Sequence, residues 1–567
     1  MRLIRHKYHF IILYLFVGLV LSCGVKKGQK DRPDVSAYKI NTEPRIQVND
    51  SMYFKGENSL RKNKFGQWEL VASGNPLDLG NTIGALSQEL LQKQEEIFFS
   101  QVEEIVPSKF KQDLLRKFLA WYNRQMYLYV KNEYKAEIKG ISRYASDKYD
   151  YIADKYLRTM YLHSAHDIGH ALQDLALVGC SSFAVWGENT TDGNLLIARN
   201  FDFYAGDDFA QEKVISFIQP EEGYNFMSVS WAGMIGVMSG MNIKGLTVTI
   251  NAGKSDVPLI AKTPISLVTR EIVQYASNID EAIEIAKKSE IFVSESILVG
   301  SAADNRAVII EMSPENFGVY ELENSSRLIC SNHFQSAAYQ SDDNNLEHIT
   351  NSHSQYRYDR MEELLDKTEI VTPEKAVAIL RNTKGLDDKD IGYGNEKALN
   401  QLLAHHGIIF EPSKKMVWVS SNPYQLGEFV AFQLDSVFIN SKKMVNTLSN
   451  ESYLIAKDSF INSQAFTSYE KYRKEKRNLQ KIIDEDLDYN SKDIDSFISL
   501  NPESWEVYYM VGRYYYKRKY YMAALLQFEK ALTKEITTLP ERMEIENYIK
   551  KINRRINDSR NRTKIKA

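Results

Sequence analysis

A glycine and a cysteine, Gly179 and Cys180, precede a strand-like run, SSFAVWG. A cysteine placed there can attack the carbonyl group before it, so that an acyl shift gives a thioester and water releases the upstream chain. The freed α-amine, with an ordinary pKa of about 7.7–8.0, can then act as the base for the Cys180 thiol. Gly179 lacks a Cβ and tolerates a strained backbone that exposes its carbonyl. The pair predicts self-cleavage; the alternative is a small buried cysteine that begins a core strand.

Four later segments carry polar residues in an order that suits this chemistry: ARNFDF, GMNIKGLTVTINAG, ICSNHF and SQYRYDR. In order and spacing they resemble the cysteine N-terminal nucleophile (Ntn) hydrolases. This group includes choloylglycine hydrolases, penicillin V acylases, acid ceramidase-like amidases and acyl-CoA:6-aminopenicillanic acid acyltransferases. The Gly-Cys pair behind a long pro-segment is most similar to the acyltransferase branch, peptidase family C45. The resemblance covers roughly residues 175–435.

The resemblance implies a role for three residues around the thiol. Cys180 matches the nucleophile, and Gly179–Cys180 matches the autocleavage bond. Asp202 matches the carboxylate that binds and orients the α-amine. Arg199 matches the arginine beside the thiol, whose charge favours the thiolate. The alternative is that Arg199 and Asp202 form a surface pair at a strand end.

Three further positions are implied in the same way. Asn251 matches one oxyanion-hole position, and Asn332 matches the asparagine that completes the oxyanion or amine network. An amide donor aimed at a developing oxyanion contributes roughly 3–4 kcal/mol. Arg357 matches the arginine of a Ser-x-x-Arg-aromatic-x-Arg pattern, although Arg360 competes for that assignment. The alternatives are structural roles for the two asparagines and a solvated helix position for Arg357.

The hydrophobic periodicity predicts helices over residues 84–177 and short strands from 179 onward. Strand groups then alternate with helices as far as about residue 435, which indicates an α+β sandwich with helices on its outer faces. The family resemblance implies the αββα sandwich of Ntn hydrolases. The predicted divisions are a signal peptide over 1–22, a linker over 23–60, a mostly helical pro-segment over 61–179, a catalytic domain over 180–440 and a helical region over 441–567.

The N-terminus predicts export. Basic residues precede an apolar run of signal-peptide length, FIILYLFVGLVLSC, which ends in Leu21-Ser22-Cys23. This ending resembles the lipobox of bacterial lipoproteins, in which Cys23 is the lipidation site. The resemblance implies a protein held at a membrane of the cell envelope by its lipid, on the periplasmic or the surface face. An uncleaved signal anchor is the alternative.

Net charge, histidine spacing and the number of cysteines indicate which partners, cofactors and disulfides can be expected. The formal net charge of −3 over 567 residues gives no reason to expect nucleic acid. A metal site could be sought at His333 or at the His405–His406 pair, but no further ligand lies at a suitable spacing. Neither a metal nor any other cofactor is expected. Cys330 is predicted to be a buried small residue, although a disulfide with Cys180 stays open in an exported protein.

The C-terminal region of the sequence has a helical pattern. Residues 505–538 have the spacing of one tetratricopeptide repeat, and an unrelated helical hairpin is the alternative. The leading interpretation is a lipid-anchored, self-cleaving amidohydrolase or acyltransferase. Its Cys180 thioester would take the acyl group from a linear, non-peptide amide of an acylated small molecule and release it to water or to an amine, with acyl-CoA as a further candidate partner. The alternative is a non-catalytic envelope scaffold whose repeat-like helices bind a protein partner.

Overall fold

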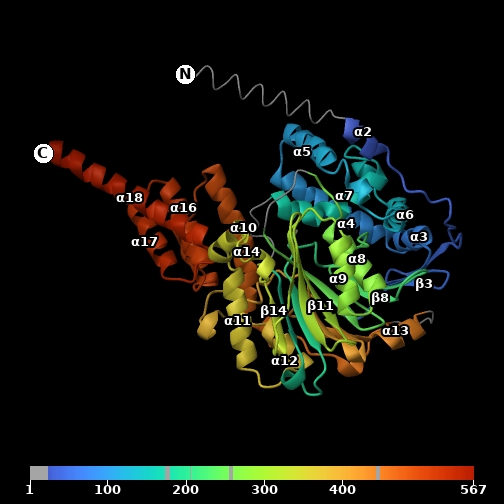
Figure 1. Ribbon diagram of the computed structural model, residues 1–567. Helices are drawn as coiled ribbons and strands as arrows, with labels where there is room; N and C mark the ends of the chain where they lie inside the picture. Colours follow the sequence, from blue (N-terminus) through green and yellow to red (C-terminus); the bar gives the residue numbers. More distant parts are fainter. Residues whose placement is uncertain (1–22, 173–178, 205, 255–259, 442–446, 567) are drawn as a thin grey trace.

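The computed structural model describes residues 23–172, 179–204, 206–254, 260–441 and 447–566. Two stacked β-sheets lie at the centre, with helical regions from the two ends of the chain on either side (Figure 1). None of the helices in the described ranges has both the length and the apolar character that crossing a membrane requires. The predicted signal peptide, residues 1–22, lies outside the described residues, as does the side chain of Cys23.

Within the described residues, the larger sheet has eleven strands in the order β1-β2-β3-β4-β7-β8-β9-β10-β11-β12-β13. Its central strands are rich in β-branched residues and are buried on both faces, because one face meets the second sheet and the other meets helices. The strands are β1 (Arg45–Asn49), β2 (Met52–Lys55), β3 (Asn58–Lys62), β4 (Trp68–Gly74), β7 (Val214–Pro220), β8 (Phe226–Ser230), β9 (Ser239–Asn242), β10 (Leu246–Ala252), β11 (Glu295–Ser301), β12 (Arg306–Met312) and β13 (Phe317–Tyr320).

The smaller sheet carries the start of the predicted catalytic domain. Its order over the described part of the chain is β14-β5-β6-β15-β16-β17, and every neighbouring pair is antiparallel. The strands are β5 (Ser181–Val185), β6 (Leu196–Phe201), β14 (Arg327–Cys330), β15 (His406–Glu411), β16 (Met416–Ser420) and β17 (Phe429–Gln433).

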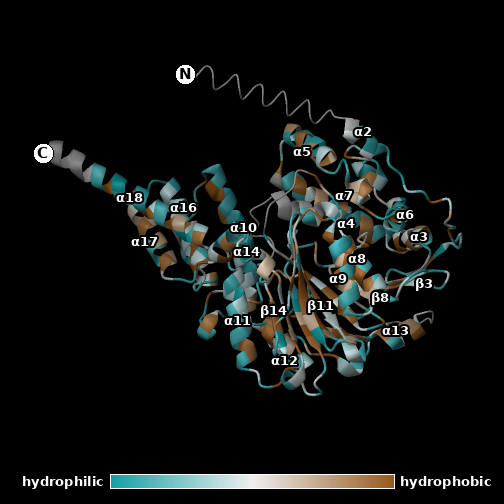
Figure 2. Cartoon of the chain, viewed as in Figure 1, coloured by the Kyte–Doolittle hydropathy of each residue, from teal (hydrophilic) through white to brown (hydrophobic). Residues whose placement is uncertain are grey.

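The two sheets face each other across a shared apolar core, to which Phe217 and Leu298 of the larger sheet and Ile197 and Phe410 of the smaller one contribute. Figure 2 shows hydrophobic residues concentrated in strands such as β11 and β14, and hydrophilic ones on α10 and α14. Helices cover both outer faces: α8 and α9 pack on β9–β12, and α11 and α12 pack on β5, β6, β14 and β15. The predicted αββα sandwich is therefore confirmed. The helices of this part are α8 (Ile265–Tyr275), α9 (Ile279–Lys288), α10 (Asp343–Asn351), α11 (Ser354–Asp366), α12 (Pro373–Leu380) and α13 (Leu434–Asn440).

The N-terminal part differs from the expectation of a linker followed by helices. Residues 45–74 form β1–β4, and β4 pairs in parallel with β7, so this segment extends the larger sheet. The physical reason is the long-range pairing of β4 with β7 (Val214–Pro220), which adds the N-terminal strands to that side of the sheet. The helices that follow contribute to the same hydrophobic core as the large sheet. They are α3 (Pro76–Leu86), α4 (Gln88–Ile105), α5 (Lys109–Tyr122), α6 (Asn132–Ser142) and α7 (Lys155–Leu172). Helix α2 (Cys23–Lys30) precedes the strands.

The C-terminal helices form a lobe beside the sandwich (Figure 1). A helical hairpin, α16 and α17, lies where one tetratricopeptide repeat is predicted, and Gly512 of α16 packs against the Phe528 ring of α17. The assignment to that repeat family stays a prediction. The helices are α14 (Gln464–Glu485), α15 (Ser491–Leu500), α16 (Trp505–Lys517), α17 (Tyr521–Leu532) and α18 (Leu539–Lys566).

Helices α3 and α6 cross where Gly80 and Gly140 let their backbones approach closely. A substitution at this crossing tests how tightly the N-terminal part is packed. A Cβ on Gly140 would lie 2.4 Å from the backbone nitrogen of Asn81 and 2.5 Å from the carbonyl oxygen of Leu77. Helix propensity alone favours alanine over glycine by about 1 kcal/mol. Overpacking at a rigid contact costs about 1–3 kcal/mol. We therefore expect Gly140→Ala to lower the melting temperature in thermal unfolding; a raised melting temperature would contradict this packing.

Candidate active site

Cys180 directly precedes β5, a central strand of the smaller sheet, and its side chain is buried. Antiparallel pairing places Ser182 of β5 opposite Arg199 of β6. As a result, Nη2 of Arg199 lies 3.6 Å from the Cys180 Sγ. Burial raises the pKa of the thiol, and the positive charge of Arg199 opposes that rise. The β5–β6 pair thus joins a thiol to a cation that favours its ionised form.

Arg199 is held in place by groups of the larger sheet. Its Nη1 donates to the carbonyl oxygen of Met238 at 3.0 Å and to Oγ of Ser239 at 2.5 Å, and its Nη2 also donates to the carbonyl oxygen of Ile250. The Ser239 hydroxyl lies 2.9 Å from Nε2 of His406. These partners carry no formal charge, so the guanidinium charge beside the thiol is not cancelled by them.

Asp202, one residue beyond β6, is fully buried. Both of its carboxylate oxygens lack a hydrogen-bond partner among the described residues. Burial raises the pKa of this carboxyl to about 7, although Arg357 and Arg199 act in the opposite direction. In the intact chain the nitrogen of Cys180 is an uncharged amide. The site therefore contains a carboxyl group that would be stabilised by a cation, and cleavage at Cys180 would create one.

The carbonyl group of Gly179 receives two side-chain donors. Nη1 of Arg357 and Nε2 of Gln401 each lie 2.9 Å from its oxygen. Gly179 does not adopt a left-handed backbone conformation, so the expected reason for a glycine needs correction. The reason is space, because a Cβ at Gly179 would lie 2.3 Å from Nε2 of Gln401.

Of the two candidate arginines on α11, Arg357 lies in the site and Arg360 does not. Its Nη1 also donates to the carbonyl oxygen of Cys180 at 2.5 Å and to Oγ of Ser181 at 2.9 Å. Its Nη2 donates to Oδ1 of Asn332 at 2.6 Å. Arg360 points elsewhere and pairs with acidic side chains, Glu363 and Asp388. The structure thus brings Arg357 and Asn332 to the Gly179–Cys180 peptide.

The two asparagines direct their donors to backbone oxygens. Nδ2 of Asn251 donates to the carbonyl oxygens of Cys330 and Ser331 at 3.0 and 3.1 Å, and its Oδ1 accepts from Ser182. Nδ2 of Asn332 donates to the carbonyl oxygen of Ala252 at 2.9 Å. In this state Asn251 therefore braces β10 against β5 and β14, and both of its amide hydrogens are in use.

Cys330 is buried close to this network, and both it and Cys180 are free, which removes the disulfide alternative. Within the ranges that the structure describes, no cluster of three or more histidine, cysteine or acidic side chains could hold a metal ion. His405 and His406 contact each other through their Nδ1 atoms, 2.9 Å apart. Of the two, His406 is connected toward the thiol, because its Nε2 contacts the Ser239 hydroxyl that accepts from Arg199.

Sequence reasoning missed two residues in contact with this network. Gln401 lies 222 positions from Gly179 in the chain, and no local pattern marks it. His353 accepts a hydrogen bond from Nε of Arg357 at its Nδ1, 3.2 Å away. His353 immediately precedes the SQYRYDR segment, and one helical turn separates it from Arg357, which is the signal that could have found it.

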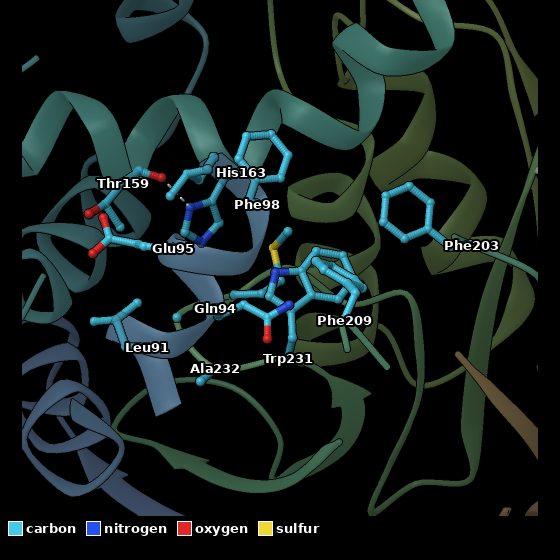
Figure 3. Close-up of a pocket in the computed structure, with 13 residues that line it drawn as sticks. Leu91, Gln94, Glu95, Phe98, Thr159, His163, Phe203, Phe209, Trp231 and Ala232 are labelled. Carbon is cyan, nitrogen blue, oxygen red and sulfur yellow. Dashed lines mark hydrogen bonds between the residues drawn. The ribbon is translucent and has the colours of Figure 1, made fainter. Parts of the chain in front are cut away.

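A small cavity lies where the N-terminal helices meet the sandwich (Figure 3). Its volume is about 40 Å³, and its lining is mostly apolar and aromatic. A row of stacked rings leads toward it from the site: Arg199 lies over Phe201, Phe201 stacks on Phe203, and Phe203 stacks on Trp231. The lining residues are Leu91, Gln94, Glu95, Phe98, Thr159, Leu162, His163, Phe203, Phe209, Trp231, Ala232, Gly233 and Met234.

The isolated carboxyl of Asp202 predicts a pH-dependent stability. Its folded pKa of about 7 lies above the ordinary value of about 3.9, so the folded chain holds this proton more tightly than the unfolded chain. The Asp202 carboxyl therefore destabilises the folded chain relative to the unfolded chain, and this effect grows as the pH rises from about 4 to 7. The test uses a Cys180→Ala background, which lacks the thiol of the proposed cleavage. The melting temperature of the Asp202→Asn variant, relative to that of its parent, should rise as the pH goes from 5 to 8. Substitution of the exposed Asp50 by Asn is the control and should show no such trend.

Three comparisons place part of this chain among known proteins. Residues 188–422 match the family model described as acyl-coenzyme A:6-aminopenicillanic acid acyl-transferase. The match begins after Cys180 and includes Arg199, Asp202, Arg357 and Gln401. An uncharacterized protein of Archaeoglobus fulgidus is 27% identical over 274 residues, which are 45% of this chain and 45% of that protein. Protein dcd1B of Dictyostelium discoideum is 25% identical over 157 residues, 27% of this chain and 31% of that protein.

The chain thus spans less than half the length of either of these relatives. Among solved structures, the Caenorhabditis elegans ortholog of N-acylethanolamine-hydrolyzing acid amidase aligns with 17% identity and a TM-score of 0.31, over 41% of this chain and 93% of that one. A mutant of conjugated bile acid hydrolase from Clostridium perfringens aligns with 14% identity and a TM-score of 0.31, over 45% and 92%. The fold assignment rests on the layer order of the sandwich itself. The match to the acyl-coenzyme A:6-aminopenicillanic acid acyl-transferase family model is thus a similarity over residues 188–422, which is less than half of this chain.

Proposed function

We propose that this chain is a self-cleaving cysteine amidohydrolase or acyltransferase that acts on a linear amide of an acylated small molecule. The observation that carries the proposal is the environment of the Gly179–Cys180 peptide. The thiol lies beside Arg199, the scissile carbonyl accepts two donors, and the Asp202 carboxyl next to them has no partner among the described residues. Each feature suits either the cleavage or the state that follows it.

Cleavage supplies the base that the intact chain lacks. The amide nitrogen of Cys180 cannot take a proton from the thiol, whereas the α-amine released by cleavage can. The ammonium ion that forms when the amine accepts this proton would pair with Asp202. Such a pair would lower the pKa of the carboxyl and remove the cost of its burial. Self-cleavage is therefore the activation step of this proposal.

Catalysis would then proceed through a thioester on Cys180. The thiolate, favoured by Arg199, attacks the carbonyl carbon of the substrate amide, and the amine leaves with the proton held by the α-amine. Water or a second amine attacks the thioester and releases the acyl group. The apolar cavity at the end of the Phe201–Phe203–Trp231 row is the candidate acyl site. Its volume of about 40 Å³ has room for a few water molecules, so an acyl chain would need the N-terminal helices to move.

The first prediction from this proposal concerns the chain itself. We expect purified full-length protein to separate on a denaturing gel into two fragments, with intact masses that place the cut between Gly179 and Cys180. Cys180→Ala should remain one chain, because it has no thiol to attack the carbonyl. Cys330→Ala is the matched control, since it removes a second buried thiol and should cleave normally. A Cys180→Ala chain that is cut at the same bond would show that a foreign protease acts there.

We also propose that the protein is exported and anchored by a lipid on Cys23. Leu21-Ser22-Cys23 at the end of an apolar N-terminal run supports this proposal. A single acyl chain gives only marginal membrane binding, so a stable anchor needs more than one chain.

The anchor gives a second prediction from this proposal. In a bacterial host, mature protein should sediment with membranes, and its N-terminal peptide should carry a lipid mass on Cys23. A chain with Cys23→Ser and a signal peptide of non-lipoprotein type should become soluble, whereas Cys330→Ser should fractionate like the parent. An unmodified Cys23 in the mature protein would refute the anchor.

A further inference from the structure

Gln401 is the residue of the site whose contacts no sequence pattern explains. It is buried, and its Nε2 lies 2.9 Å from the carbonyl oxygen of Gly179. The other donor to that oxygen, Nη1 of Arg357, is shared with the Cys180 carbonyl and the Ser181 hydroxyl. Within the described ranges, Nε2 of Gln401 donates to the Gly179 carbonyl and to no other group. Among the described side chains, Gln401 is thus the more dedicated of the two donors to the scissile carbonyl.

The backbone around Gln401 is fixed before any reaction occurs. The next residue, Leu402, is fully buried and has a φ of +54°, a left-handed conformation that is a genuine outlier for a bulky side chain. Oδ1 of Asn400 accepts from the nitrogen of Leu402 at 3.1 Å. Nδ2 of Asn200, in β6 beside Arg199, donates to the carbonyl oxygen of Leu399 at 2.9 Å. A conformation of this kind costs about 1–3 kcal/mol and persists where the surroundings impose it, as at functional sites.

The C-terminal lobe holds the same loop from the outside. Nδ2 of Asn395 donates to the carbonyl oxygen of Glu535 at 2.8 Å, and the carboxylate of Glu535 pairs with Lys397 at 2.6 Å. Nδ2 of Asn501 donates to the carbonyl oxygen of Tyr393 at 2.8 Å. The loop that ends at Gln401 therefore lies between the sandwich and the C-terminal helices and is bonded to both.

We propose that Gln401, together with Arg357, forms the oxyanion hole of the self-cleavage step; this inference rests on the proposed function. The thiol of Cys180 loses its proton as Sγ bonds to the carbonyl carbon of Gly179, and the carbonyl oxygen becomes an oxyanion. Gln401 and Arg357 donate to that oxygen. In this tetrahedral intermediate the nitrogen of Cys180 is no longer part of a planar amide, so it is basic and takes up the proton that the thiol gives up. The C–N bond then breaks, and a Gly179 thioester remains. Water hydrolyses this thioester, which releases the carboxyl group of Gly179 and restores the thiol.

The geometry also explains the residue type at position 179. Because a Cβ there would lie 2.3 Å from Nε2 and 2.8 Å from Oε1 of Gln401, any larger residue would push the amide away from the carbonyl. A Cβ at position 179 therefore could not coexist with the Gln401 amide in its present position. Gly179 and Gln401 are therefore a coupled pair, although they lie far apart in the sequence.

The test measures the rate of cleavage at 179/180 in newly synthesised full-length chains that carry Gln401→Met. Methionine keeps most of the side-chain volume and removes the donor. Loss of one oxyanion-hole donor slows a reaction by about 10²–10³-fold, which is the slowing expected here. Gln425→Met is the matched control, because Gln425 is a buried glutamine whose Nε2 donates to the Leu380 carbonyl at 3.5 Å and not to the scissile peptide. It should cleave at the parent rate.

Folding is tested separately in the Cys180→Ala background, where no variant cleaves. Equal melting temperatures with and without Gln401→Met show that the slower cleavage is a chemical effect. A clearly lower melting temperature together with equal slowing by Gln425→Met would overturn the inference in favour of a packing role. A Gln401→Met chain that is cut as fast as its parent would also overturn it. A parent chain that is not cut at 179/180 would instead refute the proposed function.

Discussion

The buried carboxyl of Asp202 is the constraint on which the rest of this site depends. A fully buried carboxyl group is costly when it has no hydrogen-bond partner, and Asp202, beside the Gly179–Cys180 peptide, has none among the residues that the structure describes. Two buried arginines, Arg199 and Arg357, contact the same peptide. An ammonium group released at Cys180 would complete this set of charges. Under the proposed function, the site of the intact chain thus already holds the carboxyl group that would pair with the amine of a cleaved one.

The packing around this site draws on all parts of the chain. Strand β4 of the N-terminal segment pairs with β7 of the sandwich, so the part upstream of the proposed cut belongs to the same sheet as the part downstream. A fragment ending at Gly179 would therefore stay bound through backbone hydrogen bonds after cleavage. From the other end of the chain, the helices around Asn501 and Glu535 hold the loop that presents Gln401. The Gly179–Cys180 peptide lies where these three contributions meet.

Local patterns predicted the parts of the site that local geometry builds. Arg199 and Asp202 lie on or beside the strand that pairs with β5, so their spacing from Cys180 reflects one hairpin-like pairing. The SQYRYDR segment forms a helix whose face selects Arg357 and turns Arg360 toward Glu363. Gln401 could not be found in this way, because its place depends on a loop held by distant contacts. Strand β4 escaped prediction for a similar reason, since its partner β7 lies more than a hundred residues later. Strands β1–β3 pair with their neighbours in sequence and continue the sheet from β4.

Infrared titration of the Asp202 carboxyl, assigned by the band that Asp202→Asn removes, tests the central claim most directly. The account predicts that the carboxyl of the uncleaved Cys180→Ala chain titrates near pH 7, as its burial requires. In the cleaved chain the same carboxyl should titrate well below that value, because the α-ammonium of Cys180 pairs with it. A carboxyl that titrates at the same pH in both chains would contradict the account.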